Sequence, residues 1–310
     1  MRILVLGAGG VGGYFGGRLA EGGADITFLV RERRRAQLRD QGLIVKSSFG
    51  DMALPVAAIG REEIDAPYDL VLLSCKAYDL DSAMEAIAPA MGPDSAVLPL
   101  INGLRQIEVL QERFGAASVL GGICYVGASL DSETGIIDHF GPFHRIPFGE
   151  LDGSVTPRVE AIAALNDQVN FDFELRTDIM QALWDKCAGQ GCISSANVLT
   201  RSVIGDITAA ASGRAFLDAV LAEGNAVGAA HGYPMMPATI KLYENIFDTP
   251  GSPFATSMLR DVEDGKPTEG AHIVGDLVAR AEAKGVAVPI LSCARTALEV
   301  YEARREKAPG

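Results

Sequence analysis

The first half of the chain alternates short apolar runs with amphipathic stretches, which predicts strands separated by helices. The expected core strands are residues 2–6, 25–30, 68–74 and 95–101. The helices expected between them are 10–21, from just after Arg31 to about 41, and 81–91. The run at 68–74 is almost wholly apolar, which is typical of a parallel strand covered on both faces. This order of elements predicts an α/β domain.

Further along, the pattern predicts shorter strands. Two runs at 43–46 and 52–56 flank a turn-like sequence and are expected to pair antiparallel. Further segments are expected to finish this part of the chain: a strand at 119–126, short antiparallel strands within 135–149, a helix at 157–168 and a strand near 171–175.

From Thr177 the pattern changes to consecutive helices. One begins at 179–186, and the stretch 187–200 that follows has no charged residue, so we expect it to be buried. Later helices are expected at 254–262, at 269–284 between a Thr268 cap and Gly285, and from Pro289 onward. We therefore predict two domains, 1–176 and 177–310, the first α/β and the second all-helical.

A glycine-rich turn, GAGGVG, directly follows the first strand and opens the first helix. Gly7 allows the tight turn, Gly9 lets the backbone approach a pyrophosphate, and Gly12 lets the helix pack on the sheet. The helix N-terminus directs its dipole and N–H groups at the phosphates. With Ala8, Gly10 and Val11, these glycines predict a dinucleotide site on a Rossmann-type, doubly wound sheet. The alternative is a glycine-rich turn that binds nothing.

The residue that closes the second strand indicates which dinucleotide binds. An acidic residue there binds the ribose 2′-OH of NAD, whereas an arginine accommodates the 2′-phosphate of NADP. Arg31 stands at this position and favours NADP, although Glu32 follows it. We interpret the next basic residues, Arg34 and Arg35, as a solvated helix start.

Composition narrows the choice of partners. The 310 residues include 27 basic and 40 acidic side chains, a net charge of −13, which argues against nucleic acid and anionic membranes as partners. No apolar run is long enough to cross a bilayer and no signal peptide is recognisable, so the cytoplasm is the expected compartment. The five cysteines and four histidines lack metal-ligand spacing, so we expect packing thiols and no metal site.

Polar residues at strand ends and helix starts are the candidates for chemistry. Lys76 and Asn102 follow core strands and are expected to contact cofactor or substrate, although a surface lysine and a plain turn are equally consistent. Lys186 borders the uncharged stretch, where desolvation would lower its pKa for proton transfer. Without further information, the local sequence favours the alternative that the Lys186 side chain extends to solvent. Taken alone, Ser257 and Glu269 are a helix cap and a dipole partner.

These motifs together resemble the ketopantoate reductases (2-dehydropantoate 2-reductases). The segments that carry the resemblance span the chain in family order: GAGGVG at 7–12, Arg31, SCKAYD at 74–79, NG at 102–103, LWDK at 183–186 and SMLRDVEDGKPTE at 257–269. The resemblance implies an NADPH-dependent oxidoreductase that converts 2-dehydropantoate to pantoate in pantothenate and coenzyme A synthesis. It is also compatible with a homodimer.

The resemblance also implies residue roles. Lys186 would protonate the carbonyl oxygen, Glu269 would bind the hydroxyl end of the substrate, and Ser257 would help hold its carboxylate. Asn102 would touch nicotinamide and substrate, and Lys76 would lie on the cofactor side.

The sequence departs from the family beside the substrate. Gln190 and Ser194 replace two asparagines, and Gly270-Ala271 replaces an Ile-Asp pair. Two alternatives therefore stay open: a reductase of another 2-keto acid or an opine-type dehydrogenase, and an NADP-binding sensor without catalysis.

Overall fold

The computed structural model describes residues 1–307, which divide into two compact units. One unit comprises residues 1–101 and 106–180, and the other comprises 102–105 and the chain from 181 onward. The division at 180/181 lies close to the boundary that the sequence predicts at 176/177. It falls inside the long helix α6 (Ile179–Thr200).

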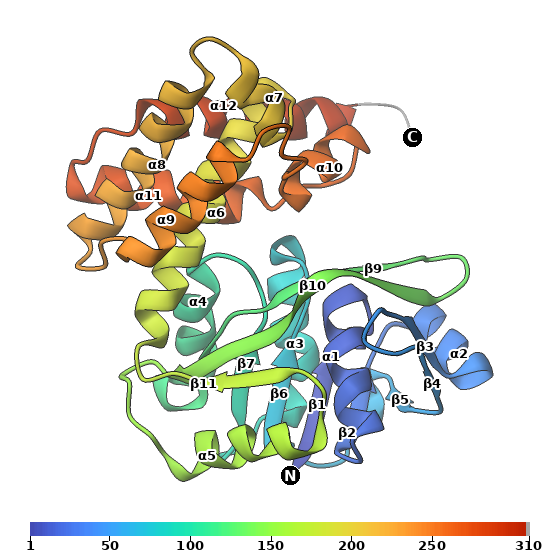
Figure 1. The fold of residues 1–310 in the computed structure, drawn as a ribbon. Coiled ribbons are helices and arrows are strands. Elements are labelled where there is room, and N and C mark those ends of the chain that lie inside the picture. Colours follow the sequence, from blue (N-terminus) through green and yellow to red (C-terminus); the bar gives the residue numbers. More distant parts are fainter. Residues whose placement is uncertain (308–310) are drawn as a thin grey trace. The chain divides into compact units, whose positions relative to one another are not determined.

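The α/β unit is built on a parallel sheet with the strand order β5-β2-β1-β6-β7 (Figure 1). These strands are β1 (Arg2–Leu6), β2 (Asp25–Leu29), β5 (Ala57–Ile59), β6 (Leu70–Leu73) and β7 (Ala96–Pro99). β1 pairs with β2 on one side and with β6 on the other, so the strand order reverses at β1. Doubly wound sheets bind ligands at such a switch point, outside the carboxyl ends of the strands.

Helices connect these strands. The α-helices are α1 (Gly10–Glu21), α2 (Glu32–Gln41), α3 (Leu80–Ile87), α4 (Arg105–Phe114) and α5 (Pro157–Ala163). Short 3₁₀ turns are η1 (Arg61–Glu63), η2 (Ala77–Asp79), η3 (Ala88–Ala90), η4 (Ala116–Ser118) and η5 (Ala164–Gln168). The predicted bounds of α1 and α2 are confirmed. The helix expected at 81–91 ends earlier, where Pro89 enters a 3₁₀ turn.

A second sheet is organised around one long strand, β10 (Ile136–Glu150). Its other strands are β3 (Leu43–Lys46), β4 (Met52–Leu54), β8 (Leu120–Gly122), β9 (Tyr125–Leu130) and β11 (Asp172–Leu175). The antiparallel pairing of β3 and β4 is confirmed. The prediction of several short strands at 135–149 is wrong, because β10 continues through an irregularity between Phe140 and His144. The strand expected at 119–126 is divided between β8 and β9.

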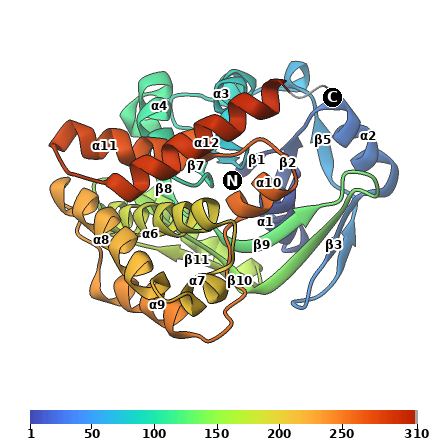
Figure 2. The same ribbon diagram turned by 90° about the horizontal axis from the view of Figure 1, so that it is seen from above.

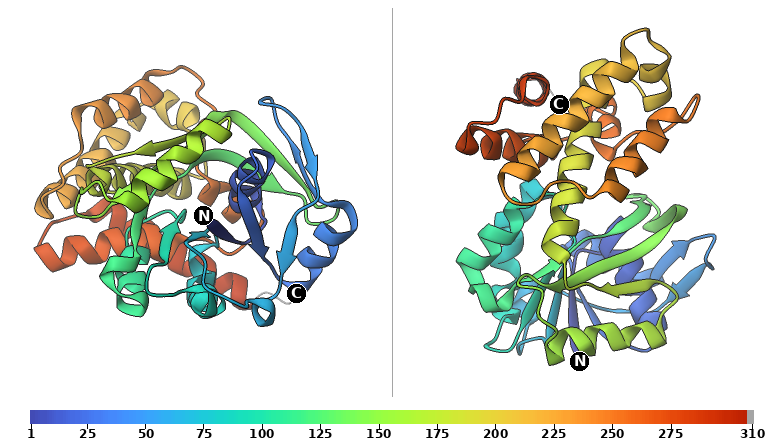
Figure 3. Two further views of the ribbon diagram at one scale, coloured as in Figure 1. Left: turned by 90° about the horizontal axis from the view of Figure 1, so that it is seen from below. Right: turned by 60° about the vertical axis from the view of Figure 1, so that its left-hand side comes forward.

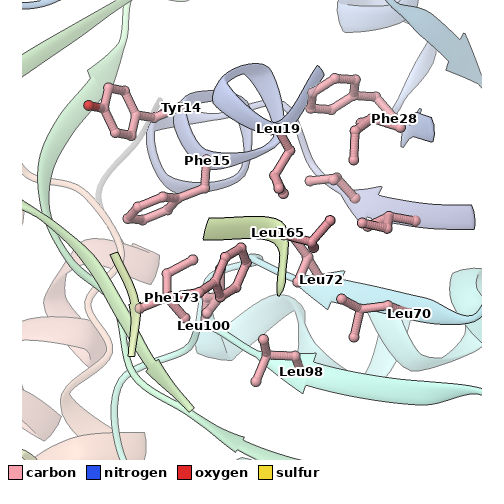
Figure 4. Packing of buried hydrophobic residues seen from close by; sticks show 14 of the residues in the cluster. Tyr14, Phe15, Leu19, Phe28, Leu70, Leu72, Leu98, Leu100, Leu165 and Phe173 are labelled. Atoms are coloured by element: carbon pink, nitrogen blue, oxygen red, sulfur yellow. The ribbon is translucent and has the colours of Figure 1, made fainter. Parts of the chain in front are cut away.

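Apolar side chains from both sheets and from α1 form one core (Figure 4). Phe15 and Leu19 project from α1 toward Leu165 and Phe173, and all four are buried. α1 contacts β1 and β2 of one sheet and β9 and β10 of the other. The helix that follows the glycine-rich turn is therefore held from both sides.

In the helical unit the other helices pack around α6, which lies between α12 and α9 (Figures 2 and 3). Its other helices are α7 (Ile204–Ala209), α8 (Gly213–Ala230), α9 (Pro237–Asp248), α10 (Ser257–Glu263), α11 (Asp276–Lys284) and α12 (Pro289–Lys307), with a π-helical turn, η6 (Ala271–Gly275). The expected burial of the uncharged stretch is confirmed, since nearly every residue of 187–198 is buried. The helix expected at 269–284 instead starts with the π turn and ends at left-handed Gly285 as expected.

Candidate functional site

The glycine-rich turn is shaped by close backbone packing. Gly7 has φ +87°, and its N–H donates to the Leu29 carbonyl at 3.0 Å. A Cβ on Gly12 would collide with the Ser74 hydroxyl and the Gly7 carbonyl, and one on Gly10 would collide with the Ala128 carbonyl. Gly7 therefore disfavours a side chain through its backbone conformation, and Gly10 and Gly12 exclude one because of the protein's own atoms.

Gly9 is different. A Cβ built on Gly9 has no atom of the described residues within 4 Å, and its backbone is extended, at φ −85° and ψ −161°. Neither packing nor backbone conformation therefore explains the glycine. Close approach of a ligand to the main chain does explain it, because a methyl group there would occupy the ligand's space.

The start of α1 offers the electrostatics that an anion requires. Gly9 is the N-cap of this helix, and its first turn contains no acidic residue. The unpaired N–H groups and the positive end of the dipole are therefore not opposed by a nearby carboxylate in that turn. The residues present fit the pyrophosphate of a dinucleotide.

Arg31 and Lys76 come together through the turn η2. Arg31 lies just after β2 with its side chain 81% exposed, and its guanidinium donates to Asp79 at 3.2 Å. Lys76 is the N-cap of η2, the turn that contains Asp79. Lys76 thus precedes the short turn that follows β6, and Arg31 binds a residue of the same turn. Their contact with a cofactor stays a prediction.

The interpretation of Arg34 and Arg35 as a solvated helix start is wrong. Arg34 is half-buried and donates from Nε to the Ala8 carbonyl at 3.0 Å, inside the glycine-rich turn. Arg35 pairs with Glu32 and Glu63. The interpretation failed because successive arginines of α2 contact different neighbours, and a run of positive charge in the sequence does not reveal those contacts.

In the helical unit, α6 presents three predicted site residues on one face. Lys186, Gln190 and Ser194 are spaced by four residues, which places them along the same side of a helix. Lys186 and Gln190 are half-buried, whereas Ser194 is fully buried. Beside Lys186, the buried Asp185 accepts hydrogen bonds from the Thr239 hydroxyl at 2.6 Å and the Gln181 amide at 2.9 Å, which fixes this turn of α6.

The buried hydroxyl of Ser194 links α6 to the start of α10. It donates to Thr256 Oγ1 at 3.2 Å, and the Thr256 N–H donates to Asn197 Oδ1 at 3.1 Å. Thr256 is the N-cap of α10, so Ser257 is its first helical residue. Lys186, Gln190 and Ser257 are thereby carried on two helices joined by hydrogen bonds. The sequence predicted a helix from 254 with Ser257 as a cap; the helix starts at Ser257 and its cap is Thr256, a usual cap residue before an apolar helix.

Glu269 and Asn102 are connected through His272. Glu269 is buried just before the π turn η6, and its carbonyl accepts from the His272 N–H at 3.1 Å. The His272 ring packs on Gly103, where an added Cβ would lie 2.9 Å from ring Cδ2, and Gly103 has φ +105°. Burial lowers the pKa of His272, with Asp276 and Glu269 opposing this effect. No sequence pattern points to His272, but π turns often occur at functional sites.

The predictions about cysteines and metals can be compared with the described residues. Cys187 and Cys192 are buried in α6, and burial raises the pKa of both thiols to about 12. They are protonated packing groups, as expected. Within residues 1–307, no cluster of three or more His, Cys, Asp or Glu side chains could hold a metal ion. In the same range, no helix combines the length and apolar character needed to span a bilayer.

Comparison with known proteins gives matches along nearly the whole chain. Residues 3–153 match the family model described as Ketopantoate reductase PanE/ApbA, and residues 178–302 match the model of its C-terminal part. An uncharacterized oxidoreductase of Bacillus subtilis, YkpB, is 35% identical over 98% of this chain and 100% of its own length.

Two solved structures extend the comparison to the fold. The crystal structure of 2-dehydropantoate 2-reductase from Methylococcus capsulatus is 27% identical, covers 99% of each chain and gives a TM-score of 0.87. A D-mandelate dehydrogenase solved with NADH and anilino(oxo)acetate covers 99% of this chain and 100% of its own, with a TM-score of 0.85. At 19% identity, that likeness is one of fold.

Proposed function

Because the chain belongs to the ketopantoate reductase family, PanE/ApbA, we propose that it uses NADPH to reduce the ketone of a 2-keto acid. The first candidate substrate is 2-dehydropantoate, the substrate named for the Methylococcus capsulatus enzyme. The observation that carries the proposal is the open space beside Gly9 at the N-terminus of α1. A glycine is needed there for a ligand and not for packing.

The preference for NADPH rests on Arg31. Its guanidinium lies at the end of β2 and is largely exposed, where it can pair with a 2′-phosphate. To do so it would exchange the solvent-exposed Asp79 for a dianionic group. Glu32 is the next residue and also exposed, and the D-mandelate dehydrogenase was solved with NADH, so cofactor preference needs a direct measurement.

In the proposed reaction the nicotinamide supplies the hydride when NADPH is bound. Negative charge then develops on the substrate's carbonyl oxygen, and Lys186 Nζ donates the proton that neutralises it. Glu269 binds the hydroxyl end of the substrate and Ser257 holds its carboxylate. Asn102 orients the carbonyl through its amide. Lys186 is thus the catalytic residue and the others bind the substrate.

A second candidate keeps the chemistry and changes the keto acid. Gln190 lies one helical turn after Lys186 and is half-buried. Its side chain is one methylene longer than the asparagine of the family, so it would narrow the space beside the substrate. Ser194 is engaged with Thr256, so it would act on the substrate through the start of α10. These differences favour a keto acid whose side chain is not that of 2-dehydropantoate.

The test is a panel of 2-keto acids assayed by loss of NADPH absorbance. Turnover of 2-dehydropantoate above all others supports the first candidate, and turnover of another member supports the second. Tight NADPH binding with no turnover of any member would contradict both and favour a nucleotide sensor. Assembly as a homodimer stays a prediction, and light scattering of the purified protein measures it.

A further inference from the structure

A ladder of side chains connects α2 to the turn between β9 and β10. Four residues on one side of α2 donate to main-chain carbonyls of this turn, at distances from 2.7 to 3.2 Å: Arg33 and Gln37 to Ser132, Arg34 to Gly135, and Gln41 to Thr134. The turn is further fixed by Asp131, whose carboxylate accepts from the Glu133 and Thr134 N–H groups. The turn is therefore held to α2 as a unit.

Arg34 is the member of this ladder that also reaches the glycine-rich turn. Its Nη1 donates to the Gly135 carbonyl at 2.9 Å, while its Nε donates to the Ala8 carbonyl at 3.0 Å. Ala8 is 2% exposed, so its carbonyl needs a partner inside the protein. A charged donor supplies the stronger kind of hydrogen bond.

The Ala8 peptide lies between Gly7 and Gly9, where backbone freedom is greatest. Rotation of this peptide would turn a carbonyl toward an incoming phosphate in place of an N–H group. The guanidinium holds the carbonyl toward α2, on the side of Gly13, where an added Cβ would lie 3.2 Å from the carbonyl oxygen. The β9–β10 hairpin adds a second contact, because β9 brings the Ala128 carbonyl against Gly10.

Resting on the proposed function, we infer that Arg34 is a positioning residue that fixes the pyrophosphate-binding conformation of residues 7–10 by clamping the Ala8 carbonyl to α2 and the β9–β10 turn. Its effect falls on the part of the cofactor that NADPH and NADH share. Arg31, in contrast, is proposed to act on the 2′-phosphate alone.

A third side-chain nitrogen of Arg34 suggests a competing role, direct contact with the 2′-phosphate. Its Nη2 is buried and makes no hydrogen bond within residues 1–307. A direct contact of this nitrogen with the 2′-phosphate would make Arg34 a specificity residue like Arg31. The two roles differ in selectivity, which can be measured.

The experiment titrates NADPH and NADH separately into purified Arg34→Ala by fluorescence, without any keto acid. We expect the dissociation constants of both cofactors to rise by a similar factor, about tenfold for the loss of charge-assisted bonds. Arg33→Ala is the matched control, because Arg33 donates to the same turn at 2.8 Å but, within residues 1–307, makes no hydrogen bond to residues 7–10. It should bind both cofactors as the wild type does.

Three results would overturn the inference: unchanged binding by Arg34→Ala, a loss confined to NADPH, or an equal loss in Arg33→Ala. Arg34→Lys, which keeps the charge but has one donor atom, should show an intermediate loss, and it serves as the test if the alanine variant does not fold. A wild-type protein that binds neither cofactor would instead refute the proposed function.

Discussion

The two units define their candidate sites by different means. In the α/β unit the site is made of main chain: Gly7 has a left-handed φ that disfavours a side chain, and neighbouring atoms occupy the space that a side chain on Gly10 or Gly12 would need. In the helical unit it is made of side chains placed on α6, α10 and the π turn. A backbone site has few tolerated changes, whereas side chains on a helix face can change while the fold persists. The candidate nucleotide site therefore tolerates few substitutions, and the candidate site of the helical unit is where we expect substrate choice to vary.

The largest expected effect is on turnover and comes from the helical unit. Lys186→Ala should lower kcat by roughly 10² to 10⁴, because it removes the proposed proton donor. NADPH binding should stay near the wild-type value, since the glycine-rich turn is untouched. Lys241→Ala, which removes an exposed lysine of α9, is the control. Near-normal turnover by Lys186→Ala would remove this residue from the mechanism.

The next effect sharpens the comparison from the α/β side. Arg31→Ala should raise KM for NADPH by roughly tenfold to a hundredfold, the cost of a lost hydrogen bond between charged groups, and should leave KM for NADH nearly unchanged. Initial rates with each cofactor measure this difference. Arg39→Ala, farther along α2, should affect neither. Equal losses with both cofactors would contradict the 2′-phosphate role.

A stability measurement compares the tolerance of a methyl group at one glycine of the glycine-rich turn and at one glycine of the π turn. Gly12→Ala should lower the free energy of unfolding by about 1–3 kcal/mol, because the new Cβ meets Ser74 and the Gly7 carbonyl. Gly275→Ala is the counterpart in the helical unit, where the nearest atom would be 3.7 Å away. Denaturant titration should find this variant as stable as the wild type. Similar losses in both would break the comparison.

The smallest expected effect is on pH dependence. Burial lowers the pKa of His272, and burial together with nearby His139 lowers that of His144. Below the ordinary value of about 6.5 the unfolded chain then binds more protons than the folded one, so stability should fall as pH falls. Denaturant midpoints at pH 7.5 to 5 should fall less steeply for His272→Gln and His144→Gln. Slopes unchanged in both variants would contradict this assignment.

The sequence predicted what short-range patterns determine. The α/β unit could be predicted because GAGGVG, flanking strands and Arg31 lie close together in the chain. The course of β10 could not, because Gly141-Pro142 normally ends a strand and here only shifts its register. Arg34 was missed because its partners, Ala8 and Gly135, are distant in sequence. The π turn that carries His272 likewise has no local signal.

The most direct measurement of the central claim uses Gly9→Ala. The account predicts a protein that unfolds at the wild-type temperature, because nothing surrounds the added methyl group, yet binds NADPH about tenfold or more weakly because the methyl group occupies the pyrophosphate's place. Thermal unfolding and NADPH titration of one preparation give both values. Wild-type affinity for NADPH in the folded variant would contradict the claim that the dinucleotide lies against the start of α1.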